Sequence, residues 1–198
     1  MNFDTNQPSW SENVILVDGD YADKVAFNLI VNFERMIGRR IPKADTARWI
    51  DCIALDGGLR EGANSVQVVF VHDRAKAAMD NFTPGNYASE LDGKAFGDHL
   101  GEFLISSVEA DGPEKVADLF AESAGILATA GGVRRVMLIP NAEEYYDSVR
   151  NALRHADDEK RITVFAMEPM AGGNFRQEIL GYSLMNALGI RADELNNC

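Results

Sequence analysis

The sequence predicts an α/β protein in which helices cover both faces of a mostly parallel sheet of five strands. Short apolar runs bounded by turn residues are typical of strands that are buried on both faces. Amphipathic helical patterns separate these runs along the chain. Because this alternation is typical of βαβ units, we expect a three-layer α/β/α architecture. At 198 residues, the chain is long enough for one domain with a full hydrophobic core.

Five stretches of the chain carry the strand pattern. The clearest is Val14-Ile15-Leu16-Val17, an apolar run that is followed directly by Asp18. The strands are expected at residues 13–18, 66–71, 103–108, 136–139 and 162–167. Residues 1–12 are rich in Asn, Ser and Gln, which predicts a flexible N-terminal leader before a single domain over residues 13–198.

Five amphipathic helices are expected beside these strands. Apolar residues recur at spacings of three and four within each of them. The glycine pairs at 57–58 and 131–132 are typical helix ends, and Pro113 is typical of a first helical turn. The helices are expected over about 22–38, 42–56, 113–129, 142–155 and 174–189. Glycine and proline interrupt residues 74–100, so loop and short helical pieces are predicted there.

The composition narrows the classes of function. The net charge of −12 repels phosphate backbones over long range, so an extended nucleic-acid interface is not expected. No apolar run is long enough for a membrane span. The two cysteines, Cys52 and Cys198, predict a reduced, cytoplasmic protein, and three histidines give little support to a zinc site. The basic pair Arg134-Arg135 is expected to be a solvated end of an element.

Acidic side chains follow the predicted strands. The carboxyl ends of parallel strands share one edge of the sheet, so these side chains can converge there. Several carboxylates around one pocket would bind Mg²⁺ or Mn²⁺, which prefer oxygen ligands. Such ions can activate a water and stabilise the leaving oxygen of a phosphodiester. The acids at this edge are Asp18, Asp20, Asp73, Glu143, Glu144 and Glu168.

A purely structural role is the alternative for most of these acids. Acids favour helix N-termini because they cap free amides and complement the helix dipole, and helix N-termini lie at this same edge. Asp73, Glu143 and Glu144 suit that role, and Asp20 is expected to cap the first helix. Asp18 differs because it ends a buried strand directly, with Gly19 beside it to allow a tight turn.

The stretch Val14-Ile15-Leu16-Val17-Asp18-Gly19-Asp20 resembles the opening of the NYN branch of PIN-like nucleases, in which an apolar strand ends in Asp-Gly-Asp-Asn or a close variant. The order of elements over about residues 13–168 is also similar, and the chain looks like an uncharacterised bacterial family as well. The resemblance implies a PIN-like, Rossmann-like fold and a metal-dependent phosphodiesterase or RNase. It implies Asp18, Asp73 and Glu144 as catalytic residues.

The same resemblance implies Asp18, Asp20 and Glu144 as ligands of Mg²⁺ or Mn²⁺. The family's second acidic motif falls on Pro140-Asn141-Ala142-Glu143-Glu144-Tyr145, where Ala142 replaces the first acid. Asp118 or Glu122 would correspond to the family's mid-chain acid, although neither spacing matches well. These departures leave open a catalytically inactive relative that serves as an interaction module or a homodimer.

A second enzyme interpretation takes Asp18-Gly19-Asp20 as the Asp-x-Asp motif of haloacid-dehalogenase-like phosphatases. Asp18 would then be the nucleophile and Asp20 the acid or base. Ala22 stands where that family has Thr or Val, and the strand ending at Val71 lacks the required Ser or Thr. This alternative is therefore ranked below the PIN-like one.

Overall fold

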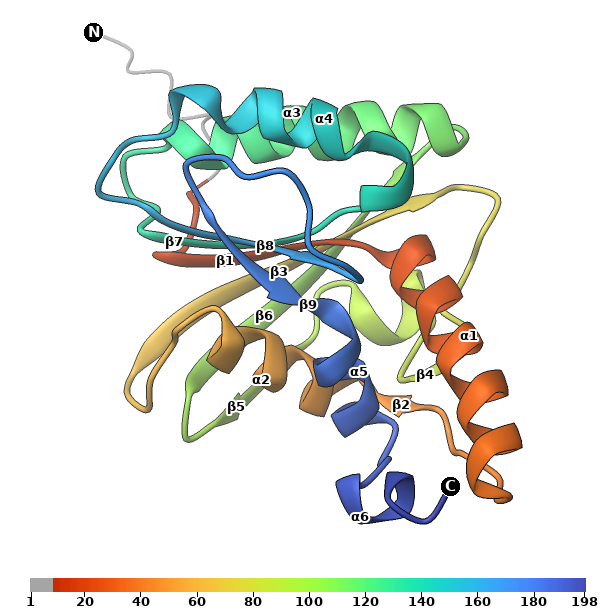
Figure 1. Ribbon diagram of the computed structural model, residues 1–198. Coiled ribbons are helices and arrows are strands. Elements are labelled where there is room, and N and C mark those ends of the chain that lie inside the picture. The colour runs from red at the N-terminus through yellow and green to blue at the C-terminus, as the bar shows by residue number, and fades with distance from the viewer. Residues whose placement is uncertain (1–8) are drawn as a thin grey trace, which may run out of the picture.

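A seven-stranded sheet forms the centre of the protein (Figure 1), whose computed structural model describes residues 9–198. The order of its strands is β5-β6-β3-β1-β7-β8-β9, and all neighbours are parallel except β5 and β6. The strands are β1 (Asn13–Asp18), β3 (Asn64–Asp73), β5 (Ala95–Asp98), β6 (Gly101–Ala110), β7 (Arg135–Ile139), β8 (Arg161–Ala166) and β9 (Arg176–Ile179). Residues 1–8 of the predicted leader lie outside the described residues.

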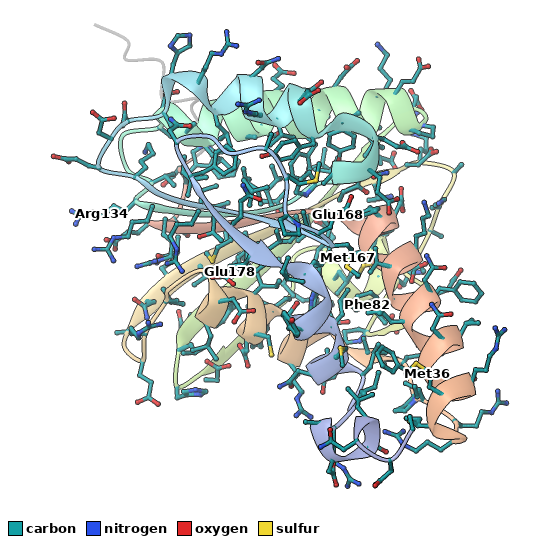
Figure 2. The ribbon with its side chains drawn as sticks, viewed as in Figure 1. Met36, Phe82, Arg134, Met167, Glu168 and Glu178 are labelled. Carbon is teal, nitrogen blue, oxygen red and sulfur yellow. The ribbon has the colours of Figure 1, made fainter. Side chains whose placement is uncertain are left out.

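Helices cover both faces of the sheet, as predicted (Figure 1). One face carries α1 (Gly19–Ile37), α2 (Thr46–Asp56) and α5 (Leu180–Ala187), and the other carries α3 (Pro113–Thr129) and α4 (Ala142–Ala152). The alternation along β1 explains this division. Ile15 and Val17 are buried in the core on the α1 face, whereas Val14 and Leu16 are buried in the core on the α3 face. Side chains fill both layers between sheet and helices (Figure 2).

The strands before and after α3 lie on opposite sides of β1 in the sheet. From β1 it proceeds to β3 and β6 on one side, and after α3 it continues with β7, β8 and β9 on the other side. The connection through α1 and α2 uses one face, whereas those through α3 and α4 use the other. The carboxyl ends of β1 and β7 therefore mark the topological switch point, the place where open α/β sheets usually bind ligands.

The prediction of five strands was too low. All five predicted strands are present, but β5 and β9 add an edge strand at each side. Both are short and mostly exposed or half-buried, so their sequences lack an apolar run. The last predicted helix begins at Leu180 as α5 and not near residue 174, because residues 176–179 pair with β8 as β9.

The stretch 74–100 holds more regular structure than predicted. Besides β5 it contains β4 (Phe82–Thr83), which pairs with β2 (Ala44–Asp45), and a π-helical turn at Tyr87–Leu91. A 3-10 turn at Leu153–His155 follows α4, and α6 (Ala192–Leu195) ends the regular structure. Among residues 9–198, no helix has both the length and the apolar character needed to cross a bilayer.

The residues just before β1 are bound to the sheet. The backbone amide of Ser11 donates a hydrogen bond to the side chain of Gln67 on β3, at 2.7 Å. The carbonyl oxygen of Glu12 accepts hydrogen bonds from the amides of Arg134 and Arg135. The chain is therefore held between β3 and β7 from residue 11 onward.

Candidate functional site

A cavity of about 240 Å³ opens at the carboxyl edge of the sheet, and four of the predicted acids line it. Asp18 and Asp20 come from the β1–α1 junction, Asp73 from the end of β3, and Glu144 from the first turn of α4. The parallel strands place these residues together because β1 pairs with β3 on one side and with β7 on the other. We call this space the carboxyl-edge cavity. Its other lining residues include Tyr21, Lys24, Lys76, Asn141 and Tyr145.

Asp18 lies at the switch point and is almost fully buried, with 4% of its surface exposed. Its Oδ1 accepts a hydrogen bond of 3.0 Å from the amide of Tyr21, which makes Asp18 the N-cap of α1. Its Oδ2 accepts a hydrogen bond of 2.6 Å from the hydroxyl of Tyr145 on α4. Burial raises the pKa of Asp18 to about 6, although these two donors oppose the shift.

Asp20 does not cap α1, contrary to the prediction, because Asp18 occupies that position. Its Oδ2 accepts a hydrogen bond of 2.7 Å from the backbone amide of Asp73, and its Oδ1 accepts one of 3.1 Å from the hydroxyl of Tyr87. Burial raises the pKa of this carboxyl group as well. Asp20 therefore ties the start of α1 to the end of β3 and to the π-helical turn.

Asp73 and Glu144 differ in how firmly they are held. The Oδ1 of Asp73 accepts hydrogen bonds from the amides of Ala75 at 3.0 Å and Gly112 at 3.3 Å, so this carboxyl group organises the turn after β3. Glu144 is exposed in the first turn of α4, where a negative charge complements the helix dipole.

The remaining acids lie outside this cavity. Glu143 forms an exposed ion pair of 3.4 Å with Lys24. Glu143 and Glu168 line a neighbouring cavity of about 290 Å³, and Figure 2 shows Glu168 beside Met167 just past β8. Asp118 and Glu122, the candidates for a mid-chain acid, are exposed on α3.

Two tyrosines shape the site, and sequence reasoning assigned them no role there. Tyr145 carries non-helical backbone angles within α4 (φ −135°, ψ 29°) and directs its hydroxyl to Asp18. Tyr87 stacks on His72 with ring centroids 3.8 Å apart and directs its hydroxyl to Asp20. Burial raises the pKa of both phenols, so they act as hydrogen-bond donors at neutral pH.

His72 is held by the backbone around it. Its Nδ1 lies 3.0 Å from the carbonyl oxygen of Asp73 and 3.1 Å from that of Lys76. Because carbonyl oxygens only accept, Nδ1 carries the hydrogen, and the ring fixes the turn that bears Lys76. The charge of Lys76 opposes the rise in the pKa of Asp18 and of Asp20.

The residues present do not form a ready-made divalent cation site. Within residues 9–198, no group of three His, Cys, Asp or Glu side chains is arranged to hold a metal ion. The oxygens of Asp18 and Asp20 already accept hydrogen bonds from protein donors. A cation at this edge would have to compete with those donors or bind beside them.

A family model matches most of the chain. Residues 7–195 match the model of a family of unknown function, DUF6621. Neither the curated proteins nor the solved structures show a significant match. The family match carries no PIN-like signal, so the PIN-like resemblance stays a prediction. Because the match spans nearly the whole chain, the protein belongs to the DUF6621 family.

Proposed function

We propose that this chain is a divergent PIN-like domain in which the metal-dependent phosphodiesterase or RNase site around Asp18, Asp73 and Glu144 is weak or lost. The PIN-like part is supported by the central position of β1 and by the acids that follow its end. The loss of activity is supported above all by Asp18, whose two oxygens are held by Tyr21 and Tyr145.

Two further features agree with a weakened site. Ala142 stands where the resemblance requires an acid, and its side chain is buried. The pKa of Asp18 is raised to about 6, so part of this carboxyl population is protonated near neutral pH, which weakens cation binding. When bound, Mg²⁺ or Mn²⁺ would supply water activation and charge neutralisation, and Asp18, Asp20 and Glu144 would be its ligands.

Calorimetric titration with Mn²⁺ tests this proposal. We expect the wild type and Asp18→Asn to give the same weak heat, and we expect negligible cleavage of a labelled single-stranded RNA. Asp147→Asn is the matched control, because it removes an exposed acid of α4 that does not line the cavity. A saturable heat that is lost in Asp18→Asn but kept in Asp147→Asn would contradict the proposal and establish a metal site.

Self-association is the second candidate function, and the outer face of α1 favours it. Phe27 and Met36 are each 53% exposed, and Val31 is 37% exposed one helical turn after Phe27. Figure 2 shows Met36 in the half of α1 that projects beyond the sheet. Size-exclusion chromatography with light scattering at two concentrations tests this candidate, with Phe27→Glu as the disrupting variant. A strictly monomeric profile at both concentrations would count against it.

The haloacid-dehalogenase-like alternative receives less support. Its nucleophile would be Asp18, but both oxygens of this buried carboxyl group already accept hydrogen bonds. A nucleophile needs an oxygen that faces the substrate.

A further inference from the structure

Arginines cluster at the amino edge of the sheet, where the parallel strands begin. Three adjacent parallel strands each begin with one: Arg135 begins β7, Arg161 begins β8 and Arg176 begins β9. Arg135 and Arg161 are direct partners in the pairing of β7 with β8. Arg176 pairs with Thr163, two residues after Arg161, so all three side chains leave the same face of the sheet. Arg60 joins them from the loop after α2.

These side chains line a cavity of about 500 Å³, which we call the amino-edge basic cavity. Its charged lining residues are Arg60, Arg135, Lys160, Arg161 and Arg176, and no carboxylate is among them. A protein with a net charge of −12 thus concentrates five cations around one space. Like charges that face one another across strand pairs destabilise a sheet, so this concentration has a cost in folding.

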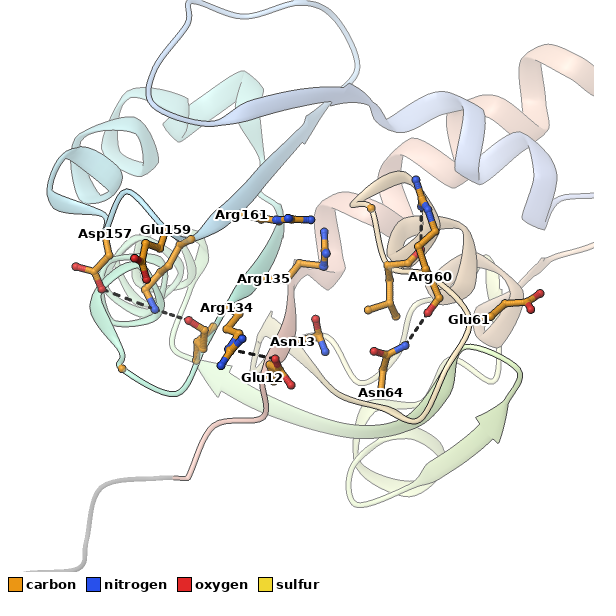
Figure 3. Close-up of a pocket in the computed structure, with 15 residues that line it drawn as sticks. Glu12, Asn13, Arg60, Glu61, Asn64, Arg134, Arg135, Asp157, Glu159 and Arg161 are labelled. Carbon is orange, nitrogen blue, oxygen red and sulfur yellow. Dashed lines mark hydrogen bonds and ion pairs between the residues drawn. The ribbon is translucent and has the colours of Figure 1, made fainter.

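A second cavity of about 710 Å³ adjoins the first and shares Arg60, Arg135 and Arg161 with it. Figure 3 shows Arg135 and Arg161 side by side near its centre and Arg60 across from them. Four acids line this second cavity, namely Glu12, Glu61, Asp157 and Glu159, and within the described residues none of them forms an ion pair with Arg60, Arg135 or Arg161. Glu12 forms an ion pair of 3.2 Å with Arg134, and Glu61 points outward (Figure 3).

Only some of the cations pair with a carboxylate. Arg176 forms an ion pair of 3.1 Å with Glu178. The buried Nζ of Lys160 lies 3.9 Å from a carboxylate oxygen of Asp157 and donates to the carbonyl oxygens of Ala130 and Val133. In the part of the chain that the structure describes, no ion pair joins a carboxylate to Arg60, Arg135 or Arg161. The positive charges of these three guanidinium groups are therefore not balanced by a paired carboxylate.

Arg135 is the most constrained of the three. One of its terminal nitrogens donates a hydrogen bond of 2.7 Å to the carbonyl oxygen of Gly57, but its Nε is buried without a hydrogen-bond partner. Burial lowers the pKa of this guanidinium, and the charges of Arg161, Arg60 and Arg176 lower it further. Gly58, with φ of +91°, lets the chain turn beside it, where a Cβ would lie 2.7 Å from a guanidinium nitrogen.

We propose that the amino-edge basic cavity binds a small phosphorylated polyanion, with Arg60, Arg135 and Arg161 as its phosphate contacts. The planar guanidinium group pairs with phosphate oxygens through two parallel hydrogen bonds, whereas the ammonium group of lysine acts as a point charge. The cavity volume of about 500 Å³ suits a ligand of nucleotide size. A bound polyanion would also offset the repulsion among the arginines and supply the missing acceptors.

The same phosphate chemistry could come from an inorganic polyphosphate or from a nucleotide. Phe175, Asn174 and Thr163 line the cavity beside the arginines, so an organic group attached to the phosphates would find an aromatic and polar wall. This site lies at the opposite ends of the strands from the carboxyl-edge cavity. It therefore stands apart from the proposed function and can be tested separately.

Titration calorimetry without divalent cations tests the proposal, with inorganic tripolyphosphate and ATP as separate probes. We expect saturable binding of at least one probe to the wild type, and binding weakened about 10- to 100-fold in Arg161→Gln. Tighter binding of ATP identifies a nucleotide, and equal binding of both identifies the phosphate chain as the recognised group. Arg134→Gln is the control, because Arg134 has the same charge at the same edge but already pairs with Glu12. We expect this variant to bind as the wild type does.

Thermal unfolding supplies a second measurement on the same variants. Without ligand, Arg161→Gln is expected to unfold at the same temperature as the wild type or higher, because it relieves repulsion in the cluster. With tripolyphosphate, the wild type should gain thermal stability that the variant lacks.

Four results would overturn the proposal. The first is that neither probe binds, and the second is that Arg161→Gln binds the probes as tightly as the wild type does. The third is that citrate binds as tightly as both phosphates. The fourth is that a single-stranded RNA binds through these arginines while the small phosphates do not.

Discussion

The hydroxyl of Tyr145 donates a hydrogen bond of 2.6 Å to Oδ2 of Asp18, across 127 positions in the sequence. This contact bridges the topological switch point, because Asp18 ends β1 and Tyr145 lies in the first turns of the helix after β7. It stabilises the ionised form of a carboxyl group whose burial favours the protonated form. The contact thus couples the packing of α4 to the charge state of the carboxyl-edge cavity.

Tyr145→Phe removes this donor and keeps the ring in the core. We expect the free energy of unfolding to fall by about 1–3 kcal/mol at pH 8, because a buried carboxylate loses a charge-assisted hydrogen bond. At pH 4.5 the loss should be smaller, since Asp18 is then mostly protonated. Urea denaturation at the two pH values checks this. An equal loss at both would show that ring packing, and not the charge of Asp18, dominates.

Asp18 should also give stability a distinctive pH dependence. The pKa of Asp18 in the folded state is about 6, against an ordinary value of 3.8. The proton that Asp18 retains stabilises the fold fully below the unfolded pKa, and this contribution is lost as the pH rises through about 6. The loss between pH 4 and pH 7.5 amounts to about 2 kcal/mol.

The difference between the wild type and Asp18→Asn isolates this contribution, because the other acids titrate in both proteins. We expect Asp18→Asn to lose less stability than the wild type over this range in urea denaturation. Parallel pH curves for the two proteins would show that Asp18 titrates at its ordinary pKa.

Gly19 is required for packing and not for the turn that the sequence predicted. It lies in α1 without a positive φ, but a Cβ there would lie 2.8 Å from Cε1 of Tyr87, whose side chain is buried. We expect Gly19→Ala to destabilise the fold by about 1–3 kcal/mol, as overpacking does. Gly172→Ala is the control, because its Cβ would meet no atom within 4 Å. Thermal or urea unfolding compares the two, and similar stabilities would contradict this assignment.

The sequence predicted the central strands well because their physical signal is local. Runs such as 14–17 are buried on both faces, so the apolar pattern alone reveals them. The edge strands gave no such signal. Residues 176–179 read Arg-Gln-Glu-Ile and bury little apolar surface, so their pairing depends on the backbone of β8. Edge strands are therefore harder to predict from sequence than central strands.

The candidate site could be predicted in part for the same reason. The rule that parallel strands end at one edge places Asp18, Asp20, Asp73 and Glu144 around one cavity. The partners of these acids could not be predicted, because they depend on tertiary packing. Tyr145, which donates to Asp18, departs from helical geometry at its own position in α4.

The prediction for Arg134-Arg135 was right for one of the two residues only. Arg134-Arg135 was expected to be solvated, yet Arg135 is partly buried while Arg134 remains exposed. Arg135 begins β7 and donates a hydrogen bond to the carbonyl oxygen of Gly57, whereas Arg134 precedes the strand. The sequence shows the charges but not the cavity that Arg135, Arg161 and Arg60 share.

The carboxyl group of Asp51 on α2 lies beside that of Asp98 on the edge strand β5. Burial raises the pKa of Asp51 to about 7, and the neighbouring carboxyl group of Asp98 adds to the shift. Asp98→Asn removes that negative charge, so we expect the pKa of Asp51 to fall toward its ordinary value while remaining above it. Carboxyl-detected NMR titration measures this directly. Asp92→Asn, in the same connection before β6, is the control and should leave Asp51 unchanged. An unchanged pKa in Asp98→Asn would show that burial alone holds the proton on Asp51.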